Sequence, residues 1–249
     1  MPDKVAKTDL ESQALATALI KNHGTFLGAA KVGIADLALL REIDCEPADL
    51  LSNSKAAIAI AVKLPNAAFE QLPNAPTPLY AQVYLNANAL LDQIALRLCA
   101  FIEQLGFDTL PIPASQPLDM KECRSHLSSK AVANAASLGW QGTSLLIVTP
   151  EYGPRVRLVT VLTDMALTPD LPLKNRCGSC TCCTEACVAQ AIRNVSTEFH
   201  YASGEEARDF SKCSNKRVNE FSKREDLGKP ICGICIKICP WGRTLTREA

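Results

Sequence analysis

The stretch "CGSCTCCTEAC", residues 177–187, places five cysteines within eleven residues. In bacterial ferredoxins with a C-x2-C-x2-C-x3-C run, three thiolates hold one [4Fe–4S] cluster and the fourth thiolate holds a second cluster. Four of the five cysteines here have that spacing: Cys177, Cys180, Cys183 and Cys187. The spacing therefore predicts another group of cysteine ligands elsewhere in the chain.

Cys213 and the later stretch "CGICIKICPW", residues 232–241, supply this second group. The crossing rule predicts cluster A on Cys177, Cys180, Cys183 and Cys239, and cluster B on Cys187, Cys213, Cys232 and Cys235. A pair of zinc sites is the alternative, although zinc favours two separated C-x2-C pairs for each ion. We expect the fifth cysteine, Cys182, to point away from cluster A. The run also departs from ferredoxins at Val188, where they have proline.

Charge and cysteine usage limit the class of protein. The chain has 26 Lys and Arg against 26 Asp and Glu, which gives no reason to expect bulk nucleic-acid binding. From residue 173 onward, 13 basic residues stand against 9 acidic ones, as expected around anionic clusters. The N-terminus has no secretory signal, and no apolar run approaches the length of a membrane span. We therefore expect a cytosolic protein whose 12 cysteines bind metal and do not form disulfides.

Hydrophobic periodicity predicts mixed helix and strand before residue 170. Helices are expected over 8–24, 78–106 and 125–139, the first with a capping pattern of Thr8 and Glu11 and the second started by Thr77 and Pro78. Strands are expected over 29–35, 55–65 and 108–115, and the alternation of isoleucine with alanine over 55–65 predicts a strand buried on both faces. The segments 143–150 and 155–164 are expected to form two strands of a hairpin or meander. The proline-containing stretch 65–78 predicts an irregular loop or lid. Strand signals end near 170–175, so we divide the chain into an α+β domain, residues 1–172, and a cysteine-rich domain, residues 173–249.

The segment "NAASLGWQGTSLLIVTPEYGPRVRLVTVLTD", residues 134–164, with both cysteine runs, resembles epoxyqueuosine reductase and its shorter relatives. The resemblance covers about residues 29–243. It implies a nitroreductase-like, corrinoid-binding mixed-sheet domain beside a small domain similar to bacterial ferredoxin with two [4Fe–4S] clusters. The implied cofactors are therefore two [4Fe–4S] clusters and a cobalamin.

The resemblance also implies site residues. The corrin pocket is expected to use the turn over 139–152 and loops beside cluster B, with the candidates Gly139, Trp140, Gly142, Thr149, Tyr152, Leu158, Asn215 and Ile236. The family has an aspartic acid proton donor upstream of this turn. An ungapped count back from Trp140 reaches Cys123, with Asp119 and Glu122 nearby, so these three residues are the catalytic candidates.

These features predict an iron–sulfur oxidoreductase that passes electrons through two clusters to a corrinoid. The acceptor would be a small substrate or the corrinoid of a partner, the donor a ferredoxin or flavodoxin, and no membrane is involved. One alternative is an electron carrier without corrinoid, and another is a tRNA epoxyqueuosine reductase acting with a separate tRNA-binding partner. The family's C-terminal helical repeats grip tRNA, and this chain ends at Ala249, so we expect no tRNA substrate without such a partner. The expected lid over 65–78 favours a small-molecule pocket.

Overall fold

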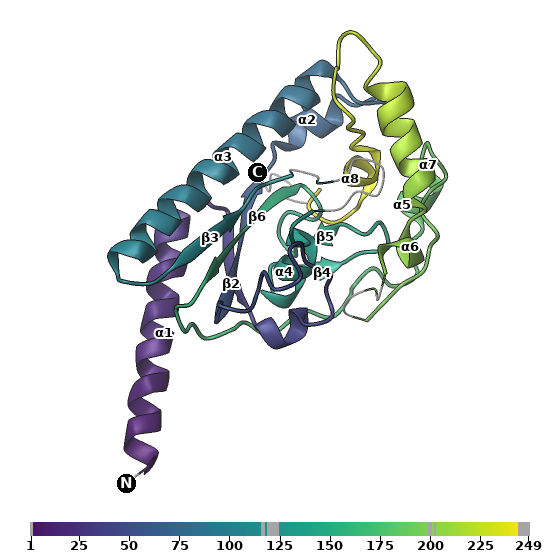
Figure 1. Ribbon diagram of the computed structural model, residues 1–249. Helices are drawn as coiled ribbons and strands as arrows, with labels where there is room; N and C mark the ends of the chain where they lie inside the picture. Colours follow the sequence, from purple (N-terminus) through teal and green to yellow (C-terminus); the bar gives the residue numbers. More distant parts are fainter. Residues whose placement is uncertain (1, 116–117, 119–124, 199–200, 202, 244–249) are drawn as a thin grey trace, which may run out of the picture.

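The computed structural model describes residues 2–115, 118, 125–198, 201 and 203–243, with the backbone alone for residues 2–10. Figure 1 shows the strands in the middle of the body, the long helices on one side and the short C-terminal helices on the other. The elements in chain order are α1 (Pro2–Phe26), β1 (Lys31–Ala35), the 3-10 helix η1 (Leu37–Leu40), β2 (Ala56–Lys63), α2 (Asn66–Glu70), α3 (Pro78–Gln104), β3 (Thr109–Ile112), α4 (Ser129–Ala135), β4 (Trp140–Gln141), β5 (Ile147–Val148), β6 (Val156–Thr163), α5 (Cys182–Glu185), α6 (Gly204–Ala207), α7 (Phe210–Asn215), the π-helix η2 (Lys216–Phe221) and α8 (Ile234–Ile238). The predicted mixed α+β class is confirmed.

Four strands form one antiparallel sheet in the order β1-β2-β6-β3. Seven of the eight residues of β2 are buried, as predicted for a strand covered on both faces. Its isoleucines contribute to the core shared with α1 and α3, whereas Ala57, Ala59 and Ala61 contribute to the core shared with α4. The small residues on the α4 side allow a close approach, since a Cβ on Gly33 would lie 2.1 Å from the carbonyl oxygen of Ala136.

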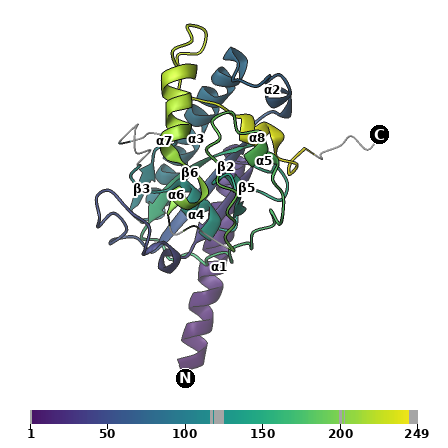
Figure 2. The ribbon, with the colours of Figure 1, turned by 90° about the vertical axis from the view of Figure 1, so that its right-hand side faces the viewer.

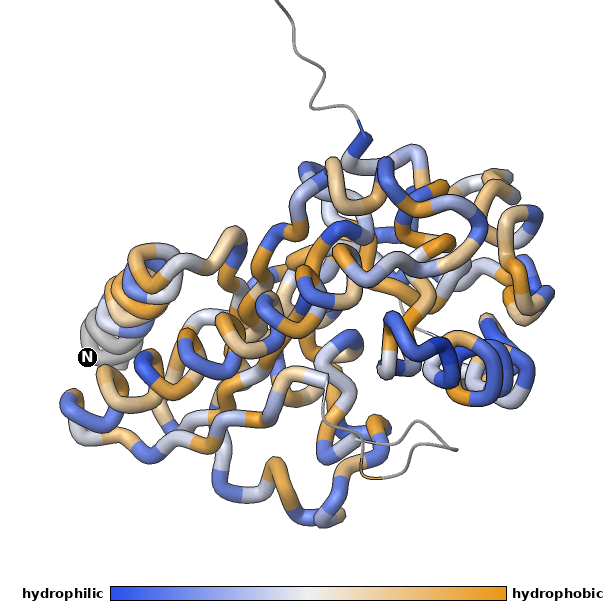
Figure 3. The backbone as a smooth tube through the Cα atoms, turned by 90° about the horizontal axis from the view of Figure 1, so that it is seen from above, coloured by the Kyte–Doolittle hydropathy of each residue, from blue (hydrophilic) through white to orange (hydrophobic). Residues whose placement is uncertain are grey.

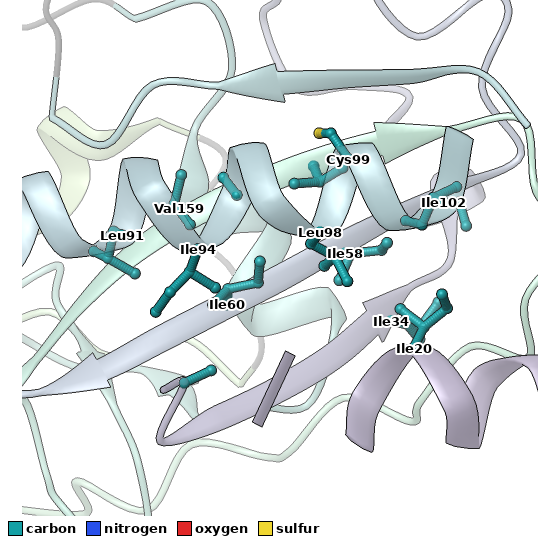
Figure 4. Close-up of a cluster of buried hydrophobic side chains, with 14 of the residues drawn as sticks. Ile20, Ile34, Ile58, Ile60, Leu91, Ile94, Leu98, Cys99, Ile102 and Val159 are labelled. Carbon is teal, nitrogen blue, oxygen red and sulfur yellow. The ribbon is translucent and has the colours of Figure 1, made fainter. Parts of the chain in front are cut away.

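The α3 helix packs one apolar face on the sheet. Thr77 caps its first turn, as predicted, by accepting a hydrogen bond from the Tyr80 amide at 3.3 Å. Figure 4 shows the face that points toward Ile58 and Ile60, formed by Leu91, Ile94, Leu98 and Ile102, each at most 1 % exposed. Burial of each such side chain contributes about 1.5–3 kcal/mol. By length and composition, α3 is also the one helix in the described chain that passes as a candidate membrane span, but this face lies in the protein core.

The α1 helix begins at Pro2, before the capping pattern expected at Thr8. Its N-terminal half projects beyond the body in two perpendicular views (Figures 1 and 2). Its C-terminal half is anchored, because Ile20 is fully buried and the Lys21 Nζ lies 2.6 Å from the Asp170 carboxylate. The same carboxylate accepts a hydrogen bond from the Ile34 amide at 2.8 Å, so the chain after β6 is tied back to β1.

Two expectations need correction. The predicted hairpin or meander does not form, because β5 pairs with β4 in a separate two-stranded sheet, whereas β6 lies between β2 and β3. The stretch 65–78, expected to be an irregular loop or lid, is irregular only after α2, and Phe69 and Leu72 are each only 1 % exposed. Their burial depends on apolar residues from far along the chain, which local sequence patterns do not reveal.

Those partners come from the cysteine-rich part. Ile231, Ile234 and Phe221 share one hydrophobic cluster with Phe69 and Tyr80, so the C-terminal segment is packed against α2 and α3. The outer segment α7–η2, at the right of Figure 3, is coloured mostly as hydrophilic. One side of the cysteine-rich part is therefore joined to the rest of the core, and another carries polar residues.

Candidate metal centre

The four thiols predicted for cluster A lie close enough together to influence one another's pKa. Burial raises the pKa of Cys183 to about 12, and its thiolate would also be repelled by Cys235 of the other predicted group and by Cys177, Cys239 and Cys180. Burial raises the pKa of Cys239 to about 11, with Cys177 and Cys180 adding to the shift. All four side chains line a single hollow, together with Cys182 and the turn over 142–144. The crossing of Cys239 to the first run is thus present in the fold.

The cluster B thiols form a second group. Burial raises the pKa of Cys232 to about 12, with contributions from Cys235, Cys213 and Cys187. Burial also raises the pKa of Cys235, with Cys213 and Cys187 again adding to the shift. Buried thiols that resist ionisation separately become thiolates when a metal cation supplies the opposing charge. Two groups of four such thiols fit two [4Fe–4S] clusters.

A single metal ion fits this arrangement less well. Four thiolates at about 2.3 Å from one zinc ion must converge on a point. Over the residues that the structure describes, no three His, Cys, Asp or Glu side chains are grouped closely enough to hold one ion. The thiol of Cys182 is exposed, and its pKa is raised first by a hydrogen bond with Cys180. The expectation that Cys182 points away from the cluster A thiols is therefore wrong, since it lines the same hollow. Its role as a bystander stays a prediction.

Tight backbone contacts hold the cluster A loop against the sheet domain. Gly153 and Gly242 face each other with positive φ angles of 55° and 77°. A Cβ on Gly153 would lie 2.0 Å from the Trp241 carbonyl oxygen. The buried Arg155 donates hydrogen bonds to the carbonyl oxygens of Trp241 at 2.7 Å and Lys237 at 3.0 Å. These contacts fix the turn that carries Cys239.

Four of the predicted corrin residues lie in the packed turn beside cluster A. A Cβ on Gly139 would lie 2.3 Å from the Val148 carbonyl oxygen, and one on Gly142 would lie 3.3 Å from the Cys177 Sγ. Trp140 is fully buried and packs edge-on against Trp241, with ring centroids 4.7 Å apart. Thr149 is fully buried, and its Oγ1 accepts a hydrogen bond of 2.9 Å from the Tyr152 amide.

The other four corrin candidates are spread over several elements. Tyr152 is half-buried under the Lys63 ammonium, and Leu158 is half-buried near the α4 side of the sheet. Asn215 is exposed at the end of α7, and Ile236 is buried in the cluster shared with α2 and α3. The described fold does not bring all eight candidates to one surface. The three catalytic candidates, Asp119, Glu122 and Cys123, lie outside the described residues.

A polar site that sequence reasoning missed lies on α3, facing β6. The Arg157 Nη2 donates to the Tyr84 hydroxyl at 3.2 Å, and its Nε donates to the Asn88 Oδ1 at 3.0 Å. The Ser115 hydroxyl lies 2.5 Å from the Tyr84 hydroxyl. Burial opposes ionisation of Tyr84, but Arg157 and the hydrogen bonds outweigh it and lower its pKa. The available signal was an arginine within the apolar strand segment 155–164.

This tyrosine site lies next to cluster B. Tyr80 precedes Tyr84 by one helical turn and is only 2 % exposed. A Cβ on Gly233 would lie 2.7 Å from the Tyr80 ring. Burial raises the pKa of Tyr80, and the Cys235 and Cys232 thiolates add to the shift. The thiols predicted for cluster B therefore have a direct neighbour in the helix that carries Tyr84.

Comparison with known proteins agrees with these observations. No protein-family model matches the chain. It is 29 % identical over 211 residues to the epoxyqueuosine reductase of Bacillus anthracis, covering 78 % of this chain and 50 % of that relative. A reductive dehalogenase structure, described in terms of B12-dependent dehalogenation, superposes with a TM-score of 0.75 at 21 % identity, covering 96 % of this chain and 33 % of that one. An epoxyqueuosine reductase bound to a tRNA stem loop superposes with a TM-score of 0.61 at 22 % identity, covering 92 % and 66 %.

The chain thus spans about half the length of the curated relative that it matches. The structural likeness, at 21–22 % identity, establishes the shared fold. Together with the sequence match, it confirms the predicted resemblance: the chain is similar to epoxyqueuosine reductases and shares its fold with a reductive dehalogenase.

Proposed function

We propose that this protein is an iron–sulfur reductase that holds two [4Fe–4S] clusters and delivers electrons to a corrinoid beside cluster B. The single observation that carries the proposal is the gathering of eight half-buried cysteines with the spacing of bacterial ferredoxins. The thiols of Cys177, Cys180, Cys183 and Cys239 line one hollow, and those of Cys232 and Cys235 interact with Cys213 and Cys187. The similarity to epoxyqueuosine reductase and to a B12-dependent dehalogenase supports a corrinoid. A ferredoxin or flavodoxin is the proposed donor.

Cluster B is the proposed exit for electrons. Its Cys235 interacts electrostatically with Tyr80, and Tyr80 precedes the polar site around Tyr84. Cluster A is the proposed entry, because the exposed residues Gly178 and Cys182 lie in the loop that carries its ligands. A corrinoid would supply a metal that takes up electrons one at a time and uses them at the substrate.

Tyr84 is the proposed proton donor. Reduction of a bond by two electrons leaves negative charge on the product, and the Tyr84 Oη–H neutralises it by giving up its proton. Arg157 then stabilises the phenolate through the hydrogen bond to Oη, and Asn88 orients the guanidinium. The lowered pKa of Tyr84 means that this transfer needs less driving force than it would from a solvated tyrosine.

The test combines metal content with corrinoid binding. Anaerobically purified protein should contain about eight irons per chain and absorb through thiolate-to-iron charge transfer. Cob(II)alamin should bind in a one-to-one ratio, with no nitrogen superhyperfine splitting in its electron paramagnetic resonance spectrum, because the lower base is displaced. Stoichiometric zinc without iron would refute the metal assignment. Bound clusters without cobalamin binding at tens of micromolar, about 6 kcal/mol of affinity, would leave an electron carrier.

The variant Tyr84→Phe tests proton donation independently of electron transfer. The variant should keep both clusters and bind cobalamin, yet lose most of the substrate reduction, typically 10²- to 10⁴-fold for a proton donor. Val83→Ala changes the neighbouring half-buried residue on α3 and is the matched control. Unchanged reduction by Tyr84→Phe would exclude Tyr84 as the donor.

A modified base in tRNA is the second candidate substrate. One observation favours it, namely the shared fold with an epoxyqueuosine reductase that binds a tRNA stem loop, of which this chain covers 66 %. Reduction of epoxyqueuosine in a stem loop, with and without an added tRNA-binding partner, distinguishes this substrate from a halogenated small molecule.

A further inference from the structure

Arg208 lies between two segments that carry cluster B ligands. Its backbone forms an antiparallel bridge with Ile192, flanked by a hydrogen bond from the Asp209 amide to the Ala191 carbonyl at 2.8 Å. The amide of Ala191 in turn lies 3.3 Å from the Cys187 Sγ. The short helix α6 begins with a capping box of Ser203 and Glu206 and ends at the residue before Arg208. The arginine backbone is therefore held firmly beside this cluster.

The guanidinium reaches a second ligand. Its Nη1 lies 3.8 Å from the Cys213 Sγ, within the range of a hydrogen bond to sulfur. Its Nη2 donates to the Ser144 carbonyl oxygen, and its Nε is buried without a hydrogen-bond partner among the described residues. The same side chain interacts electrostatically with Cys235. One cation thus faces two of the four cluster B thiols.

No carboxylate in the described chain forms an ion pair with Arg208. The nearby Glu205 pairs with Arg193, and Asp209 pairs with Lys212. A half-buried cation without a counter-charge is costly, because the low-dielectric surroundings replace water. Among the residues that the structure describes, the thiolates of a bound cluster would supply the negative charge that the guanidinium contacts. Arg155 differs, because two of its nitrogens donate to backbone carbonyls in the turn carrying Cys239.

We infer that Arg208 sets the reduction potential of cluster B above that of the same cluster without the arginine. The inference rests on the proposed iron–sulfur function. Reduction adds one electron to an anionic cluster, so a fixed positive charge and an N–H···S hydrogen bond stabilise the reduced state more than the oxidised state. A raised potential at cluster B favours passage of an electron from cluster A toward Tyr84. Arg208 acts by placing a fixed positive charge beside cluster B, and it does not contact the substrate.

Redox titration of the anaerobic full-length protein tests this inference. Arg208→Gln removes the charge, whereas Arg208→Lys keeps the charge and loses the planar guanidinium. Lys212→Gln is the matched control, because it removes a positive charge next to Cys213 from a side chain that is 60 % exposed. The reduction step of the titration that Cys213→Ser changes is assigned to cluster B.

Arg208→Gln should keep eight irons and lower the potential of cluster B. At a fixed potential we expect at least a tenfold fall in the reduced-to-oxidised ratio, which is about 59 mV for one electron. Arg208→Lys should recover part of this shift, and Lys212→Gln should match the wild type. An unshifted potential in Arg208→Gln with its iron retained would overturn the inference. Wild-type protein without iron would instead refute the proposed function.

A measurement on the wild type covers the case in which Arg208→Gln loses iron. Protein grown with arginine labelled by ¹⁵N in its guanidino nitrogens should show a ¹⁵N hyperfine coupling to reduced cluster B in pulsed electron paramagnetic resonance. Arg208→Lys should lose that coupling. Absence of the coupling in the wild type would show that the guanidinium does not contact the cluster.

Discussion

Substitution of Gly153 by alanine tests the contact that holds the cluster A loop. The backbone φ of Gly153 is 55°, and a left-handed conformation costs a residue with a side chain about 1–2 kcal/mol. The added Cβ would lie 2.0 Å from the Trp241 carbonyl oxygen. A relaxed carbon–oxygen contact is roughly 3.3 Å. The loop carrying Cys239 must therefore move away from Gly153. Because the Trp241 carbonyl oxygen moves with this loop, its hydrogen bond from Arg155, 2.7 Å long in the structure, is broken.

A hydrogen bond with a charged donor contributes about 1.5–3 kcal/mol. With the backbone cost, the total penalty for Gly153→Ala is about 2.5–5 kcal/mol. Gly228→Ala is the matched control, because its φ is 57° and an added Cβ meets nothing within 4 Å. The control should carry only the backbone cost. The difference of about 1.5–3 kcal/mol corresponds to roughly a 10- to 150-fold change in an equilibrium constant.

Iron release to a chelator measures this difference. Under anaerobic conditions Gly153→Ala should lose half of its iron, that of cluster A, about 10- to 150-fold faster than Gly228→Ala if release proceeds through the undocked loop. The charge-transfer absorbance gives the rate, and electron paramagnetic resonance identifies the remaining cluster. Equal release rates in the two variants would show that the Gly153–Trp241 contact does not control retention of cluster A.

Three further predictions follow from particular side chains. Cys182→Ser should keep the wild-type iron content, and a loss of four irons would make Cys182 a ligand. Arg157→Met should raise the pKa of Tyr84, because the cation that lowers it is removed; reduction requires protonated Tyr84, so the alkaline limit of the pH–rate profile should move to higher pH. Leu98→Ala, at a fully buried site, should lower the free energy of unfolding by about 2–5 kcal/mol in chemical denaturation of the metal-free protein, whereas Leu96→Ala, 61 % exposed, should change it little.

Sequence patterns predicted features that depend on local spacing. The alternation of isoleucine and alanine over 55–65 predicted β2, and Thr77 with Pro78 predicted the start of α3. Local spacing also predicted the two cysteine runs, whereas the crossing of Cys239 to the first run came from the pattern of two-cluster ferredoxins. For β2, for the start of α3 and for each cysteine run, neighbouring residues alone contain the signal.

Features that depend on distant residues were missed. Tyr84 and Arg157 are 73 residues apart, and only the packing of α3 on β6 brings them together. Phe69 looked like part of a loop because its apolar neighbours, such as Ile234, come from the C-terminal segment. The strand β4 has only two residues, too few for periodicity to reveal that it pairs with β5 in place of β6.

The crossed ligand pattern also affects the unfolded chain. With cluster A bound, Cys183 and Cys239 are joined through iron and sulfide across 56 residues of sequence. A covalent cross-link that closes a loop of this length removes chain entropy worth on the order of 4 kcal/mol from the unfolded state. A bound cluster would then cross-link distant segments of the chain in addition to carrying electrons. Destruction of cluster A by oxygen should therefore expose the stretch between its ligands to proteases, so that proteolysis reports oxidative damage even where no catalytic assay exists.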